Sequence, residues 1–425
     1  MQKAKTIRDI YRVFKPEEFL SEKEKELYVD VFADDMGKIS DRLEWSENEQ
    51  ETIFIAGQPG NGKSTALRLL PVVHNVINQE YDIHYLNGRD KFDAVNRIDA
   101  IDVVLLIGFL FANKTPKLRD EYIKKLEELK SKKIGELQKL EESLSSDIKH
   151  SDTSTESGFK IDLNFLKIGI DFEDNFRHIE ETKTTARKLL KSKKRDFLDI
   201  TNEIIKKYQL TLKGNKKILL IVDDIEKQKD SDDIFTHDIG TLLELKCNKI
   251  ITMPIHLKRK HAFAGQTAIE LSIKLKEKSK DDCIGENIKL LEEIIKNRID
   301  KDFYDSFIRD DAVKKIVLMS GGNLRQLISL VKESALSAKG SEVITLQDVE
   351  SAIYSFKKQY SSATKMMDEF LKYIQKHHKP ENFDDENIKL LAKATRNQMI
   401  FAYHNNESWY DINPIVANKE PCKIQ

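Results

Sequence analysis

The sequence predicts an α/β fold in which a parallel β-sheet carries helices on both faces. Two largely apolar runs support this prediction, TIFIA at 52–56 and ILLIV at 218–222, because strands that are buried on both faces read as near-continuous apolar runs. Segments with helical spacing alternate along the chain with these runs and with three further candidate strands. Such alternation is typical of parallel strands joined by helical crossovers.

Composition places the chain among charged globular proteins. Its 425 residues suffice for two or three domains, and 40% hydrophobic residues argue against a disordered chain. The formal net charge of −1 gives no general attraction to nucleic acid, so a nucleic-acid patch would have to be local. The scattered cysteines Cys247, Cys283 and Cys422 lack metal-binding spacing and suit a reducing compartment. Without a signal-peptide pattern or a membrane-spanning run, we expect a cytoplasmic protein with no membrane association.

A glycine-rich segment directly follows the first apolar run. GQPGNGKST at 57–65 matches the P-loop (Walker A) pattern G-x-x-x-x-G-K-[ST], and the residues after it have the character of a helix start. Glycines let backbone N–H groups approach phosphate oxygens, and the helix N-terminus adds unpaired N–H groups. We expect Lys63 to reach the β- and γ-phosphates and Ser64 to ligate Mg²⁺. The predicted phosphate-binding residues are Gly57, Pro59, Gly60, Asn61, Gly62, Lys63, Ser64 and Thr65.

Acidic residues end the second apolar run. Asp223 follows it at the predicted carboxyl edge of the sheet, where open α/β sheets bind their ligands. We expect Asp223 to hold Mg²⁺ through water. Asp224 is the first candidate for orienting or deprotonating the attacking water, and Glu226 is the second. The two motifs together predict a site for a nucleoside triphosphate with Mg²⁺.

With both motifs the chain resembles the AAA+ and STAND P-loop ATPases, in the group of origin-recognition-like and NACHT- or KAP-like proteins. The resemblance covers roughly residues 10–356, in which 82–90 and 268–275 resemble the second and fifth core strands. It implies that the nucleotide is ATP. It also implies that Thr252 is the sensor-1 residue and that Arg325 is the sensor-2 residue, which reaches the γ-phosphate. The N-terminal segment would pack near the adenine.

The chain departs from the family pattern in two respects. Walker B strands of this family usually end in Asp-Glu, whereas this chain has Asp223-Asp224, which is closer to signalling ATPases and puts rapid processive hydrolysis in question. No arginine finger is identifiable. Arg259 and Arg298 are the suggestions that the sequence offers, and each is read more simply as a surface arginine.

We predict three domains. Residues 1–275 form the ATPase core, 284–358 a helical lid, and 364–425 a small winged-helix-like domain of two helices and a strand hairpin. The core carries an insertion at 115–210, whose coiled-coil-like spacing predicts a helical hairpin with an apolar tip of alternating strands. This tip either packs on its own protein or docks a partner. The basic cluster at 188–195 either contacts phosphates or is a solvated helix face.

Three functions are consistent with these features. The first is an ATP-hydrolysing conformational or assembly switch that forms a homo-oligomer or binds a protein partner through 115–210. By family resemblance, such a switch would act in bacterial phage defence. The second is a DNA-binding initiator or helicase loader, although the mildly basic segment at 385–397 gives DNA only weak support. The third is a scaffold that binds ATP structurally with little turnover.

Overall fold

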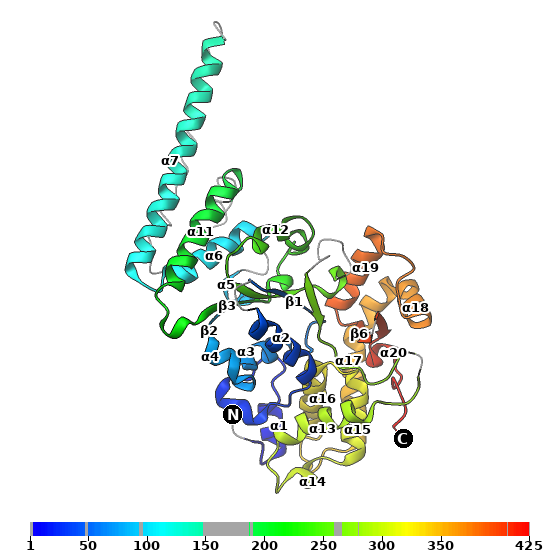
Figure 1. Ribbon diagram of the computed structural model, residues 1–425. Helices are drawn as coiled ribbons and strands as arrows, with labels where there is room; N and C mark the ends of the chain where they lie inside the picture. The colour runs from blue at the N-terminus through cyan, green and yellow to red at the C-terminus, as the bar shows by residue number, and fades with distance from the viewer. Residues whose placement is uncertain are drawn as a thin grey trace.

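The computed structural model describes residues 3–46, 50–92, 97–147, 187, 190–258, 266–278, 280–405 and 407–424. At its centre lies a five-stranded sheet in the order β2-β3-β4-β1-β5, in which all neighbouring strands are parallel (Figure 1). The predicted parallel α/β sheet is therefore confirmed. The strands are β1 (Thr52–Ala56), β2 (Tyr81–Asn87), β3 (Lys217–Asp223), β4 (Asn248–Met253) and β5 (Thr267–Glu270).

Both faces of the sheet are buried, as the apolar runs predict. Along β1, Ile53 and Ile55 belong to one apolar cluster, whereas Phe54 and Ala56 belong to a second. Successive side chains of a strand point to opposite faces, so these two clusters lie on the two sides of the sheet. Each cluster needs its own cover of helices, which is why the chain places helices on both sides.

The first cluster joins the sheet to the N-terminal helices, the P-loop helix and the helices that follow β5. The helix α3 begins directly after the P-loop and packs on this side of the sheet. The elements concerned are α1 (Ile7–Val13), α2 (Ala33–Trp45), α3 (Lys63–Val73), α4 (Asn75–Glu80), α13 (Gly285–Asn297), α14 (Tyr304–Phe307), α15 (Asp310–Ser320), α16 (Leu324–Ser337) and α17 (Leu346–Met366). The short helix η1 (Glu22–Leu27) belongs to a separate small cluster, in which Leu27 packs with Leu20 and Leu69.

The second cluster joins the opposite face to helices of the insertion and to the C-terminal region. The apolar run at 101–112 forms α6 (Ala100–Ala112), which is buried, and Asp99 caps its N-terminus. Helices α7 (Pro116–Asp147) and α11 (Lys194–Gln209) pack against α6 and against each other. Figure 1 shows α7 extending well beyond the body of the protein. In the part of the chain that the structure describes, no helix is long and apolar enough to cross a bilayer.

Much of the predicted insertion lies outside the described residues. This applies to its expected strand tip at 159–172 and to Lys188 of the basic cluster. Of the same cluster, Lys191 forms an ion pair with Asp99 at the start of α6. That contact ties Lys191 to its own protein.

The C-terminal region consists of two helices, a two-stranded antiparallel sheet and one helical turn, in the predicted order. These elements are α18 (Asp368–His377), α19 (Asp385–Arg396), β6 (Ile400–Asn405), β7 (Glu407–Ile412) and α20 (Pro414–Ala417). The predicted second strand ends early, because Pro414 begins a helical turn that Asn413 caps. Helix α17 runs on to Met366, so the predicted boundary at 358–364 falls near the end of one continuous helix.

The fifth strand is shorter than the predicted segment 268–275. It ends at Glu270, which pairs with Ala56, the last residue of β1. Beyond Ala56 the neighbouring chain turns into the P-loop and offers no further strand to pair with. The residues after Glu270 instead lie against the turn between α15 and α16, where the carbonyl of Ile273 packs on Gly322 so closely that a Cβ there would lie 1.9 Å from it.

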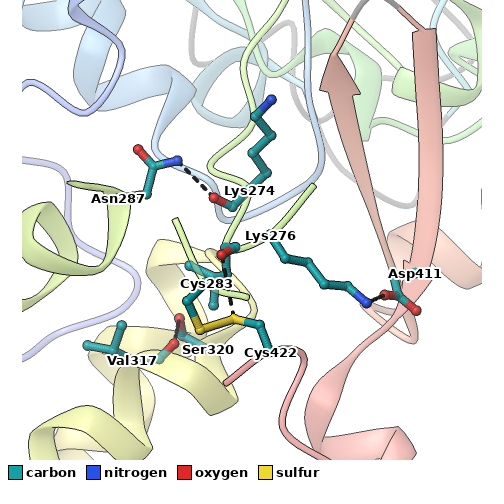
Figure 2. Close-up of a disulfide and its surroundings, with 9 residues drawn as sticks. Lys274, Lys276, Cys283, Asn287, Val317, Ser320, Asp411 and Cys422 are labelled. Atoms are coloured by element: carbon teal, nitrogen blue, oxygen red, sulfur yellow. Dashed lines mark hydrogen bonds and ion pairs between the residues drawn. A yellow bond between two sulfur atoms is a disulfide. The ribbon is translucent and has the colours of Figure 1, made fainter. Parts of the chain in front are cut away.

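A disulfide joins Cys283 to Cys422 (Figure 2). The two residues are 139 positions apart in the sequence, and backbone hydrogen bonds hold the two segments together beside the bond, from Cys283 to Lys423 at 3.0 Å and from Lys423 to Asp281 at 2.7 Å. The spacing of the cysteines did not predict this pairing. Only the tertiary fold brings the two segments together, so no local pattern marks the pairing. Within the described chain, Cys247 is the free cysteine, and it is buried.

Candidate functional site

The P-loop connects the end of β1 to the start of α3. Gly60 and Gly62 have φ angles of +86° and +94°, a left-handed conformation that glycine adopts without a Cβ penalty. Gly62 directly precedes α3, so Lys63 and Ser64 occupy the first helical turn, where backbone N–H groups lack intrahelical partners. The loop therefore ends at a helix N-terminus that is suited to an anion.

Other loop residues fix the position of the P-loop. The side-chain amide of Asn61 donates a hydrogen bond to the carbonyl of Leu271, just after β5. At Gly57 a Cβ would lie 2.8 Å from that same carbonyl, so only glycine fits this close approach. Thr65, the last predicted phosphate-binding residue, lines a separate pocket described below.

Lys63 is buried beside the acidic end of β3. Its Nζ donates hydrogen bonds to the carbonyls of Gly57 at 2.7 Å and Gln58 at 3.3 Å, and lies 3.7 Å from Oε1 of Glu226. Burial lowers the pKa of Lys63, because the charged ammonium is removed from water. A phosphate group would supply this ammonium with the negative charge that favours its protonated form.

Asp223, Asp224 and Glu226 form a buried acidic cluster at the carboxyl end of β3. Their exposed fractions are 0%, 0% and 7%, and one oxygen of each lies within 4.8 Å of those of the others. Among the described residues, Oδ2 of Asp224 and Oε1 of Glu226 have no hydrogen-bond partner. Buried carboxylate oxygens without donors favour a cation, and an all-oxygen set is the kind that Mg²⁺ prefers. The residues therefore fit the expected ion.

Asp224 turns toward cations of neighbouring elements. Its carboxylate forms an ion pair with Lys227 and lies 3.5 Å from Nε of Arg89. Arg89 belongs to α5 (Gly88–Lys91), which follows β2. The φ of Asp224 is +63°, a conformation that is costly for a residue with a Cβ and that recurs at functional sites. This turn brings the next carboxylate, Glu226, back toward the P-loop.

Glu226 faces the P-loop. Thr252, in β4, donates a hydrogen bond of 2.6 Å to its Oε2. Burial raises the pKa of Glu226, because the charged carboxylate loses its hydration. Glu226 lines a cavity together with Gly57, Pro59 and Lys63. A buried carboxylate with a raised pKa, one oxygen of which lacks a hydrogen bond and faces the P-loop lysine, has the properties of a general base.

Thr252 links Asp224 to Glu226. Its hydroxyl also accepts the backbone N–H of Asp224 at 3.0 Å, and the residue is fully buried. Strand β4 lies between β3 and β1, and Thr252 pairs with Ile55 near the end of β1. Because the strands are parallel, this threonine reaches the same edge of the sheet as the P-loop and the acidic cluster.

The predicted lid contacts the backbone carbonyls of the P-loop. The N–H of Arg325 donates to the carbonyl of Gly60 at 2.8 Å, and the side chain of Asn323 donates to the carbonyl of Pro59 at 2.8 Å. In the described residues, the Arg325 side chain lines the pocket next to Gly60 and not the cavity shared by Lys63 and Glu226. The structure thus brings Arg325 to the loop but not into the cavity of the predicted catalytic carboxylate.

The C-terminal region also reaches the P-loop, which the sequence did not indicate. The side chain of Gln398 donates to the carbonyl of Pro59 at 3.3 Å, and the N–H of Ala402 donates to the Gln58 side chain at 2.7 Å. Arg396, at the end of α19, lines the same cavity as Lys63. These contacts join residues more than 300 positions apart, and no local pattern marks them.

A largely apolar pocket lies between the N-terminal segment, the P-loop and helices α13 and α16. The family resemblance predicts that an adenine packs near the N-terminal segment, which contributes to this pocket. Arg298, one of the suggested arginine fingers, lines this pocket in its own chain, whereas Arg259 lies outside the described residues. Its lining includes Phe19, Leu20, Tyr28, Val29, Phe32, Thr65, Ala66, Leu324, Arg325 and Ile328.

No protein-family model matches the sequence, and no curated protein matches it. Solved structures with a similar fold include Cdc6p from Pyrobaculum aerophilum, with 12% identity over 96% of this chain and 94% of that chain, and a TM-score of 0.41. The Aeropyrum pernix ORC1 protein in complex with DNA has 10% identity over 96% and 95% of the two chains, and a TM-score of 0.41. The Thermotoga maritima RuvB Holliday junction branch migration motor has 10% identity over 96% and 99%, and a TM-score of 0.39. With likenesses this distant, function has to be argued from the residues of the site.

Proposed function

We propose that the protein binds ATP with Mg²⁺ and hydrolyses it, as an AAA+- or STAND-like nucleotide-dependent switch. The observation that carries this proposal is the position of the P-loop lysine. Lys63 is buried in the first turn of α3, with its Nζ 3.7 Å from Glu226 at the end of a different strand. A phosphate-binding loop that faces a buried carboxylate is the arrangement that phosphoryl transfer to water needs.

The residues divide the chemistry between them. Ser64 in α3 and Asp223 at the end of β3 would hold Mg²⁺, which when bound neutralises phosphate charge. Lys63 would pair with the β- and γ-phosphates. Glu226 is the better general base of the two acidic candidates, since it lines the cavity shared with Lys63, where Thr252 holds its Oε2. Asp224 instead forms ion pairs with Lys227 and Arg89. The proton of the attacking water would pass to Glu226. Asp224 would instead help the acidic cluster to hold Mg²⁺.

The P-loop contacts suggest how nucleotide binding moves the rest of the protein. The carbonyl of Pro59 accepts hydrogen bonds from Asn323 of the predicted lid and from Gln398 of the C-terminal region. A nucleotide that changes the loop changes both contacts, and a ligand that favours one arrangement shifts the population toward it. We propose that 284–358 and 364–425 are the moving parts, and that the arm formed by α7 and α11 is the surface for a protein partner or a second copy.

Phosphate release and nucleotide binding test the proposal when both are measured for the wild type and for Lys63→Ala. We expect ATP turnover in the wild type and loss of both binding and turnover in the variant, because the buried ammonium is the main cation of the loop. Unchanged binding by Lys63→Ala would contradict the assignment of the site. Tight ATP binding without turnover in the wild type would favour the scaffold alternative. DNA binding that weakens steeply with salt would favour the initiator alternative.

A further inference from the structure

Tyr85 donates a hydrogen bond to Oδ2 of Asp223, the carboxylate proposed to hold Mg²⁺. The other oxygen, Oδ1, accepts the backbone N–H of Asp224 at 2.9 Å. Each oxygen of this fully buried carboxylate thus has one fixed donor, and its orientation is set from two sides. Groups that hydrogen-bond a metal ligand fix its orientation and tune its affinity for the ion.

The sheet places Tyr85 in reach of Asp223. Strand β2 pairs in parallel with β3, and Asn87 lies directly opposite Asp223. Tyr85 is two positions earlier on the same strand, so its side chain leaves the sheet on the same face as that of Asn87. The length of the tyrosine ring carries its hydroxyl along the strand direction to the carboxylate at the strand end.

Arg68 lies between two aromatic rings next to this contact. Its Cζ is 4.8 Å from the ring centre of Tyr85 and 4.9 Å from that of Phe19. A guanidinium at such distances is attracted by both ring faces. Its buried Nε has no hydrogen-bond partner among the residues described, so the two ring contacts are what hold this side of the guanidinium. Arg68 belongs to α3, the same helix that carries Lys63 and Ser64.

Phe19 also lines the largely apolar pocket between the N-terminal segment and the P-loop, which we call the nucleoside pocket. The stack of Phe19, Arg68 and Tyr85 therefore begins at this pocket. Contacts therefore run without a gap from the pocket to Phe19, then to Arg68, Tyr85 and finally Asp223. A base that packed on Phe19 would restrain its ring, and the contacts with Arg68 and Tyr85 give that restraint a route to the carboxylate.

We propose that Tyr85 is a positioning residue for the Mg²⁺ carboxylate Asp223, and that the stack of Phe19, Arg68 and Tyr85 couples the nucleoside pocket to metal binding. This inference rests on the proposed function. It makes the coupling reciprocal, since a base that favours Mg²⁺ binding must itself bind more tightly when Mg²⁺ is present.

The hydroxyl of Tyr85 is tested with Tyr85→Phe, which removes one oxygen and keeps the ring. A fluorescent ATP analogue is titrated in EDTA, and Mg²⁺ is then titrated into the analogue complex. We expect affinity in EDTA to be unchanged and the Mg²⁺ concentration at half-effect to rise about tenfold, as is typical when a group supporting a metal ligand is lost. Tyr81→Phe is the matched control, because Tyr81 is a buried tyrosine of the same strand whose hydroxyl donates to the carbonyl of Leu43 at 2.6 Å.

The coupling is tested with Phe19→Leu, which removes a ring from a partly exposed position and keeps it apolar. With the ATP analogue we expect this variant to raise the Mg²⁺ concentration at half-effect. With inorganic tripolyphosphate, which has no base, we expect wild type and variant to need the same Mg²⁺ concentration. An equal increase with both ligands would overturn the coupling.

The outcomes separate this inference from the proposed function. A wild type whose affinity for the analogue ignores Mg²⁺ would contradict the proposed function and this inference together. A Mg²⁺-dependent wild type with Tyr85→Phe no different from Tyr81→Phe would contradict this inference alone. So would a loss of affinity in Tyr85→Phe that is equal in EDTA and in Mg²⁺, since that is the mark of a purely structural role.

Discussion

The hydroxyl of Thr252 donates a 2.6 Å hydrogen bond to Oε2 of Glu226. The same hydroxyl accepts the backbone N–H of Asp224 at 3.0 Å, so its donor and its acceptor roles are both used. This leaves Oε1 of Glu226 as the oxygen that lies near Lys63. A residue that resembles sensor 1 thus determines which oxygen of the carboxylate faces the phosphate-binding loop.

We predict that Glu226→Gln lowers the turnover number at least about a hundredfold, with little change in nucleotide affinity, because a general base typically contributes a factor of about 10² to 10⁴. Asp224→Asn should cost less turnover and should instead raise the Mg²⁺ requirement, since Asp224 already pairs with Lys227. Phosphate release and binding of a fluorescent analogue measure both quantities. A larger loss of turnover in Asp224→Asn than in Glu226→Gln would contradict this prediction. Asp224 would then be the first candidate for the general base, as the sequence suggested.

The sequence predicted those parts of the site that follow from local spacing. The P-loop could be recognised because Gly62, Lys63 and Ser64 must stand between a buried strand and a helix, and Asp223 because it ends an apolar run. Contacts of Pro59 with Gln398, or of Asp223 with Tyr85, depend on tertiary packing and leave no periodic signal in the sequence.

Gly60 shows how a motif residue can have a second cause that the sequence hides. The motif explains it by phosphate approach. The structure adds that a Cβ there would lie 2.7 Å from Cβ of Arg325 and 2.8 Å from Oδ1 of Asn323, so the lid can approach only a glycine. The same small residue thus serves two functions, of which only one can be inferred from spacing.

We therefore predict that Gly60→Ala destabilises the protein by about 1–3 kcal/mol and weakens nucleotide binding, because the new methyl group meets the lid at a positive φ. Gly37→Ala is the matched control. Gly37 lies within α2 with no atom within 4 Å of an added Cβ, so alanine should stabilise that helix by about 0.5–1 kcal/mol. Thermal unfolding and analogue binding measure the two effects. Equal behaviour of the two variants would contradict the proposed contact between loop and lid.

Lys249 gives a pH-dependent prediction. Its ammonium is buried, with hydrogen bonds to the carbonyls of Leu245 at 2.7 Å and Cys247 at 3.1 Å, and burial lowers its pKa. Between the lowered pKa and the ordinary value of about 10.4, the unfolded chain binds more protons than the folded one. The free energy of unfolding therefore gains a contribution that increases with pH in this window. Relative to Lys249→Met, the wild type should become more stable as pH rises from neutral toward about 10. Urea unfolding of both proteins at several pH values measures this difference, and parallel pH profiles would contradict the prediction.

The disulfide between Cys283 and Cys422 predicts a definite thiol count. The chain has three cysteines, and burial raises the pKa of the Cys247 thiol to about 11, which keeps it in its unreactive protonated form. A thiol reagent should therefore label the oxidised native protein very slowly. It should find one thiol after unfolding without reductant and three after reduction.

Cys422→Ser should also lower the free energy of unfolding of the oxidised protein by about 2–4 kcal/mol, because the disulfide closes a long loop and restricts the unfolded chain. Cys247→Ala is the control for losing a cysteine without losing the bond. Three thiols in the unfolded, unreduced protein would show that the bond does not form, and the C-terminal segment would then be held to the lid side by its backbone hydrogen bonds and apolar packing.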